Sequence, residues 1–145
     1  MSMKHILSVG EELLTCVKEG DSQPNAVDLI VKDIFKLNDS EFRLEGDDKT
    51  HRGSEKLYVD EYGNWNLQPG VYEIIMDNIV NIPEGYAGWV ITRSTLNRNG
   101  VHLTSGLYDT GYDGVMAGVM HAINRNSNID TQSVNCPLIP KAFHT

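Results

Sequence analysis

Two guanidinium groups and two hydroxyl groups lie close together in the run Arg93-Ser94-Thr95-Leu96-Asn97-Arg98-Asn99-Gly100, directly after an apolar stretch. Arginine and hydroxyl side chains at the end of a strand can donate hydrogen bonds to several phosphate oxygens at once. Arginine, serine and asparagine also occur in ordinary solvated turns. The run therefore indicates either a phosphate-binding segment or a polar turn.

A carboxylate and an aromatic ring follow residues 93–100, which we call the phosphate-type run. Asp109 ends an apolar, hairpin-like segment that starts at Val101, and Tyr112 lies between Gly111 and Gly114. Beside a bound phosphate, an aspartate can position or deprotonate a water molecule for attack on phosphorus. A nearby aromatic ring can stack on a sugar or a base. A hairpin turn capped by Asp109 explains the same residues without any function, so both interpretations stay open here.

The segments that would position these residues are predicted to be short strands. Turn signals rich in glycine and proline separate apolar runs at residues 26–35, 73–82, 86–92 and 115–123. Short strands separated by turns predict an all-β sandwich or barrel rather than alternating strands and helices. A short N-terminal helical segment is expected where apolar residues recur at near-helical spacing from Ile6 to Val17.

Two regions lie outside this strand pattern. Residues 38–64 are rich in charge and are predicted to be a solvated excursion of the sheet with a hairpin around residues 57–59, or alternatively an interaction surface. Residues 124–145 show little alternation, so their organisation is not specified. Because 145 residues suffice for one core, residues 1–145 are predicted to form one domain.

Composition and residue spacing exclude several classes of protein. The net charge of −8 argues against a nucleic-acid partner. No apolar run is long enough for a membrane span or a signal peptide, so a cytoplasmic protein without a membrane partner is expected. Cys16 and Cys136 lie too far apart for a zinc cluster, and the five histidines show no spacing typical of metal ligands. Glycine-rich nucleotide fingerprints are also missing.

Several segments, taken in order, carry a resemblance to a known superfamily. They are residues 23–29, the turns at 67–70 and 82–85, and the runs 93–96 and 106–114. Over residues 23–122 the chain resembles the trimeric dUTP diphosphatases and dCTP deaminases, with Thr95 in place of the second serine of an Arg-Ser-Ser motif. The resemblance implies a distorted β-barrel or jelly roll, a homotrimer with sites between subunits, and hydrolysis of dUTP to dUMP and pyrophosphate.

The resemblance also implies roles for single residues. Asp109 would activate the water that attacks the α-phosphate, Tyr112 would pack on the deoxyribose, and Asp28 would support the site. Mg²⁺ would be held mainly through the substrate phosphates, without direct ligands from the chain. The phosphates and the base would contact the remaining site residues, which are Arg93, Ser94, Thr95, Arg98, Asn99, Gly100, Thr104, Gly106 and Leu107. Such an enzyme keeps the nucleotide pool free of dUTP, in the host cytoplasm if a phage encodes it.

The two branches of the superfamily differ at one position. The deaminase branch carries a proton-shuttling glutamate ten positions after the aspartate, and Val119 stands there. Because valine cannot carry protons, the diphosphatase is favoured. Arg98 and the pair Gln23-Pro24 look more like the deaminase branch, so a dCTP deaminase, alone or in a bifunctional enzyme, stays an alternative.

The family's next strand motif and its glycine-rich C-terminal arm are missing after Ile123. Either residues 124–145 complete the fold in another way, or they are a divergent end that weakens activity. A non-catalytic protein of the superfamily that binds nucleotides or other proteins therefore stays open as well.

Overall fold

Strands dominate the chain, which confirms the predicted all-β class. The computed structural model describes residues 26–125, 127–129, 134–136 and 138–140. The predicted N-terminal helical segment lies outside these residues. Within the described ranges there is one helix, α2 (Ser94–Arg98), and no helix is long and apolar enough to cross a membrane.

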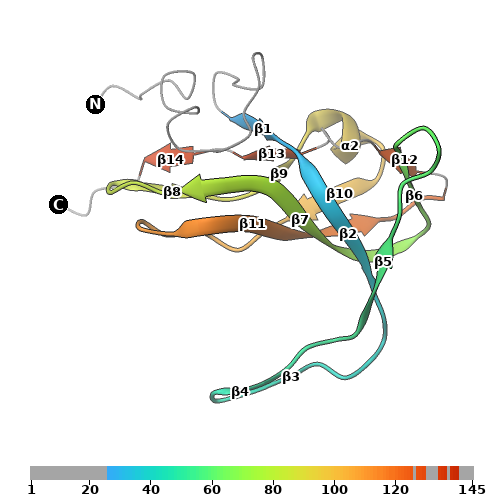
Figure 1. Cartoon of the computed structure of the whole chain (residues 1–145), viewed down its shortest axis with the longest axis horizontal. Helices are drawn as coiled ribbons and strands as arrows, with labels where there is room; N and C mark the ends of the chain where they lie inside the picture. The colour runs from blue at the N-terminus through green and yellow to red at the C-terminus, as the bar shows by residue number, and fades with distance from the viewer. Residues whose placement is uncertain (1–25, 126, 130–133, 137, 141–145) are drawn as a thin grey trace.

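The largest sheet has eight strands in the order β1-β13-β9-β10-β11-β7-β2-β5, and neighbouring strands are antiparallel (Figure 1). Its strands are β1 (Val27–Leu29), β2 (Val31–Leu37), β5 (Ser54–Leu57), β7 (Gly70–Asn81), β9 (Ile91–Thr92), β10 (Val101–Thr104), β11 (Asp113–Ala122) and β13 (Val134–Cys136). Three strand pairs form small separate sheets: β3 (Arg43–Glu45) with β4 (Asp48–Thr50), β6 (Trp65–Leu67) with β12 (Ser127–Ile129), and β8 (Tyr86–Gly88) with β14 (Leu138–Pro140). The long central strands β7 and β11 therefore form the spine of the fold.

Alternation along β7 separates a core face from an outer face. Tyr72, Ile74 and Met76 are fully or almost fully buried, whereas the side chains between them are only half-buried. This pattern follows from the two-residue period of a strand. The Tyr72 hydroxyl donates a hydrogen bond to the carbonyl of Gln68 at 2.6 Å, and burial raises the pKa of this phenol. The outer face of the sheet stays partly open to solvent.

The tail completes the sheets through its backbone. β13 lies between β1 and β9, while β12 pairs with β6 and β14 pairs with β8. Of the two interpretations left open by the sequence, the structure therefore supports the one in which residues after Ile123 build the fold. Three-residue strands are too short to show alternation, which explains why the pattern did not predict them.

The hairpin expected around residues 57–59 is wrong. The chain turns instead at Gly46, which has a φ of +59° and connects β3 to β4. Leu57 ends β5, which pairs with β2 in the main sheet and packs Leu57 against the core. Figure 1 shows β3 and β4 projecting away from the body of the molecule as an arm.

Candidate active site

Backbone hydrogen bonds on both sides of Asp109 hold the loop that carries it, residues 105–112. The backbone of Tyr108 exchanges two hydrogen bonds with Gly88, at 2.7 and 3.0 Å. Further along, the amide of Gly111 donates to the Ile82 carbonyl at 2.8 Å, and the amide of Ile82 donates to the Tyr112 carbonyl at 2.9 Å. The turn between these anchors therefore has little freedom to move.

The side chain of Tyr108 adds a third anchor, which sequence reasoning missed. Its hydroxyl accepts a hydrogen bond from the Ala117 amide and donates one to the Ala117 carbonyl, both at 2.7 Å. The ladder between β11 and β7 is irregular at this point, with a register shift between Val115 and Ala117. The ring of Tyr108 lies 4.8 Å from the ring of Tyr112, centre to centre. The only signal in the sequence was an aromatic residue directly before Asp109.

Asp109 itself is exposed to solvent. It opens a tight turn in which the Tyr112 amide donates to the Asp109 carbonyl at 3.1 Å, and Gly111 has a φ of +83° within that turn. A carboxylate on a fixed backbone that water can reach has the properties needed of a general base. Tyr112 is half-buried, and its hydroxyl donates to the Val115 carbonyl at 2.6 Å.

Residues 94–98 of the phosphate-type run form helix α2, and Asn99 and Gly100 follow in a turn. Four side chains of the run line one pocket of about 250 Å³, which we call the helix pocket: Ser94, Thr95, Arg98 and Asn99. Ser94 and Arg98 share one side because residues four apart are neighbours on a helix. Five helical residues are too few for a periodic apolar pattern, so periodicity could not reveal a helix here. The lining offers two hydroxyls, an amide and a guanidinium, which suit an anion.

Arg93, the residue directly before α2, contacts Asp28 of β1. The Arg93 Nη2 atom is 3.9 Å from the Asp28 Oδ2 atom, and the two side chains are 43% and 14% exposed. Asp28 therefore makes a long ion pair with the first residue of the phosphate-type run. Gly100 has a φ of +77° after the helix, and a Cβ there would lie 3.1 Å from the Asn124 side chain. Gly100 lies in the turn between α2 and β10.

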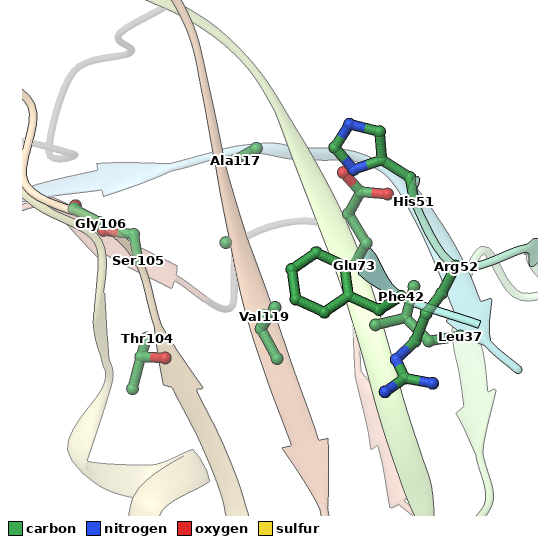
Figure 2. A pocket seen from close by; sticks show the side chains of 11 residues that line it. Leu37, Phe42, His51, Arg52, Glu73, Thr104, Ser105, Gly106, Ala117 and Val119 are labelled. Atoms are coloured by element: carbon green, nitrogen blue, oxygen red, sulfur yellow. The ribbon is translucent and has the colours of Figure 1, made fainter. Parts of the chain in front are cut away.

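A larger pocket of about 540 Å³, which we call the sheet pocket, contains other predicted residues (Figure 2). Thr104 and Gly106 line it, together with Val119, the position where the deaminase branch has its glutamate. The other lining residues are Leu37, Phe42, His51, Arg52, Glu73, Ser105, Ala117 and Gly118. Leu107, which is 60% exposed, does not line this pocket.

Eight of the predicted site residues thus form three groups in one chain, while Asp28, Arg93, Gly100 and Leu107 line neither pocket. Asp109 and Tyr112 belong to the anchored loop and line neither pocket, whereas four residues of the phosphate-type run line the helix pocket and Thr104 and Gly106 line the sheet pocket. Sequence reasoning missed Glu73 because its strand pairing, and not its spacing from any motif, places it in the sheet pocket.

Comparison with known proteins identifies the family. The family model described as dCTP deaminase-like matches residues 2–132. The chain belongs to the dCTP deaminase-like family. Three archaeal relatives carry the name deoxyuridine 5'-triphosphate nucleotidohydrolase, two of them as probable.

The relative from Aeropyrum pernix is 38% identical over 66% of this chain and 58% of its own length. The relative from Methanopyrus kandleri is 36% identical over 71% of this chain and 67% of its own length. The relative from Methanocaldococcus jannaschii is 30% identical over 74% of this chain and 70% of its own length. This dCTP deaminase-like chain therefore spans little more than half the length of some of the relatives it matches.

Solved structures support the fold. A 2'-deoxycytidine 5'-triphosphate deaminase from Agrobacterium tumefaciens superposes with a TM-score of 0.61 and 13% identity, over 94% of this chain and 47% of its own. A mutant dUTPase from phage phi11 of S. aureus superposes with a TM-score of 0.56 and 13% identity, over 91% of this chain and 92% of its own length. The dUTPase-like fold expected from the sequence is therefore confirmed.

The donor set fits a magnesium ion that arrives with the substrate. In the part of this dCTP deaminase-like chain that the structure describes, no three His, Cys, Asp or Glu side chains gather as a metal site of the protein would require. Mg²⁺ in nucleotide-binding enzymes takes many of its ligands from phosphate oxygens and water. The helix pocket is lined by hydroxyl, amide and guanidinium groups, which would suit phosphates that carry such an ion.

Proposed function

We propose that this chain hydrolyses dUTP to dUMP and pyrophosphate. The observation that carries the proposal is Asp109, an exposed carboxylate on a turn whose backbone is hydrogen-bonded at both ends. A binding module has no need for a water-accessible carboxylate on a backbone held in this way. The names of the archaeal relatives support the same reaction.

Each group would act at one place in the reaction. Asp109 orients a water molecule and takes its proton while the water oxygen bonds to the α-phosphorus and the bond to the departing pyrophosphate breaks. Ser94 and Arg98 donate hydrogen bonds to phosphate oxygens. The Tyr112 ring packs against the deoxyribose, where a ribose 2'-hydroxyl would clash. A Mg²⁺ ion held through the substrate phosphates would neutralise part of their charge.

We also propose that the complete site forms between copies of this chain in a homotrimer. The helix pocket and the sheet pocket have no lining residue in common, and Asp109 lines neither of them. The outer face of the sheet carries exposed apolar side chains, including Ile79 at 44%, Ile91 at 43% and Val115 at 41%. Neighbouring copies would cover such a face. Sedimentation at micromolar concentration tests this assembly, because a monomer would contradict the shared site.

A substrate panel tests the reaction. Purified protein with Mg²⁺ is given dUTP, dCTP, dTTP and UTP in parallel, and the released products are measured. Pyrophosphate and dUMP from dUTP alone are expected, in keeping with a role in clearing dUTP from the cytoplasmic nucleotide pool. Ammonia released from dCTP would favour the deaminase despite Val119. Nucleotide binding without turnover would favour the non-catalytic protein.

A further inference from the structure

Glu73 is the one acidic side chain among the residues that line the sheet pocket (Figure 2). It lies in the middle of β7, where its Cα partners are Val119 on β11 and Phe35 on β2. Residues directly opposite each other in an antiparallel ladder project from the same face of the sheet. Glu73 therefore shares the outer face with two apolar neighbours, and it is half-buried there.

Within the described ranges, the Glu73 carboxylate makes no hydrogen bond and no ion pair. Another carboxylate on this face, that of Asp33 on β2, binds the Lys56 ammonium group at 2.7 Å. Lys56 is thus engaged by another acid. A half-buried carboxylate between apolar neighbours loses hydration without a compensating bond, which favours a ligand that supplies a donor.

The walls of the sheet pocket suit a flat heterocycle. Figure 2 shows Glu73 and Phe42 on one side of the pocket and Thr104 on the other, with Val119 between them. A volume of about 540 Å³ falls in the usual range for small-molecule sites. Arg52 adds a guanidinium group at the rim, where its Nη1 atom donates to the Ser40 carbonyl at 2.6 Å. The pocket thus combines apolar and aromatic surface with one carboxylate, one guanidinium group, the His51 imidazole and the hydroxyls of Thr104 and Ser105.

We propose that Glu73 is a specificity-determining residue that accepts a hydrogen bond from N3–H of the uracil ring; the inference rests on the proposed function and deepens it. An ionised carboxylate is an acceptor only. The pairing edge of uracil presents the N3–H donor between two carbonyl oxygens, whereas cytosine presents a bare N3 acceptor at the same place. Glu73 facing N3 therefore attracts uracil through a charge-assisted hydrogen bond and repels cytosine.

The test measures base preference in binding, independently of turnover. The α,β-imido analogues of dUTP and dCTP are titrated by calorimetry, with Mg²⁺, into the wild-type protein and into Glu73→Gln, Glu73→Ala and Asp77→Asn variants. Asp77 is the matched control, because it is an exposed carboxylate on the same strand outside the lining of the sheet pocket. Thermal melts identify which of the Glu73 variants are folded.

The wild-type protein is expected to prefer the uracil analogue, and Asp77→Asn to keep that preference. Removing a charge-assisted hydrogen bond should lower the preference by about 10- to 100-fold in Glu73→Gln, because the glutamine amide can turn its N–H₂ group toward the N3 of cytosine. The Glu73→Ala variant should also lose the preference for the uracil analogue. A folded Glu73 variant with wild-type preference would overturn the proposal, as would a wild-type protein that binds both analogues equally or neither.

Failure of this inference can be told apart from failure of the proposed function. In the first case, a Glu73→Gln variant keeps the wild-type base preference and releases pyrophosphate from dUTP normally. That result rejects the role of Glu73 and leaves the diphosphatase in place. A wild-type protein that prefers the uracil analogue through Glu73 but releases no pyrophosphate rejects the diphosphatase and leaves the role of Glu73 in place.

Discussion

Two segments that would serve one reaction are built in opposite ways. The loop of residues 105–112 is bound to its surroundings through the backbones of Tyr108 and Gly111 and through the hydroxyls of Tyr108 and Thr110. The side chains of the helix pocket, in contrast, are exposed on a helix of five residues. The backbone of one segment is held by hydrogen bonds on both sides of Asp109, whereas the other segment exposes its side chains to solvent.

The difference corresponds to two kinds of task. A general base must aim at one proton, and misplacement by about 1 Å can cost a large part of the rate, so a fixed backbone is useful. Donors to a polyphosphate contact a flexible, highly charged group, so they can adjust as it binds. We therefore expect substitutions in the loop to lower kcat and substitutions in the helix pocket to raise KM.

The largest effect is expected from Asp109→Asn. The amide cannot take a proton from water, so kcat for dUTP should fall by about 10²- to 10⁴-fold while the affinity for an α,β-imido analogue stays nearly unchanged. Pyrophosphate release and calorimetry measure the two quantities. Asp113→Asn, at another exposed carboxylate four positions further along, is the control and should keep its turnover. Turnover that survives Asp109→Asn would remove the assigned base.

Arg98→Ala should act on binding instead. Loss of a guanidinium group that donates to phosphate costs about 1.5–3 kcal/mol, which raises KM for dUTP by about 10- to 100-fold. Initial rates over a range of dUTP concentrations separate KM from kcat. Arg125→Ala removes an exposed arginine outside the helix pocket and should change neither constant. A fall in kcat at constant KM would break the contrast between the two segments.

Tyr108→Phe tests the side-chain anchor of the loop. The substitution leaves the amide and carbonyl of Ala117 without their hydroxyl partner, which should lower the free energy of unfolding by about 1–3 kcal/mol. Because the loop loosens, kcat should fall by more than KM rises. Urea unfolding at fixed protein concentration measures stability. Tyr62→Phe, at a tyrosine 80% exposed, should leave stability and kcat unchanged. Equal stability of the two variants would contradict this anchor.

Gly111→Ala should have the smallest effect. Its φ of +83° disfavours any side chain, at a cost of about 1–2 kcal/mol, although the new Cβ would meet no atom within 4 Å. Gly63→Ala imposes a similar strain at a φ of +79°, also in open space, in a turn outside both pockets. Thermal melts should show similar losses, whereas only Gly111→Ala should lower kcat. Equal activity of the two would show that the turn needs no fixed geometry.

The sequence predicted the long strands. It did not predict the features that depend on which strands pair with each other. The apolar run at residues 73–82, which follows a turn signal, predicted the strand β7, and in the structure the side chains of β7 alternate between two faces. In contrast, the role of Glu73 depends on its being opposite Val119, and the anchor at Tyr108 depends on an irregular ladder in β11. Neither relation is visible from spacing along the chain. The turn at Gly46 was missed because the aromatic and branched residues at 57–59 carry a stronger local strand signal.

Parts of the candidate site could be predicted because the residues are neighbours in sequence. The run from Ser94 to Asn99 forms one pocket, and Asp109 and Tyr112 share one loop. Their roles in hydrolysis stay predictions until the variants above are measured. The division of these residues into separate groups could not be predicted, because it results from the path of the chain between α2 and the loop.

The place of β13 has a consequence for how the chain folds. Val27 pairs with Cys136, so a strand near the start of the described residues finds its partner near their end. During synthesis, β1 must wait until almost all of the described chain has left the ribosome before it can join the sheet. Pairing over such sequence separation slows folding and leaves strand edges open to wrong partners in the meantime. The newly made chain should therefore depend on chaperones more than its small size suggests.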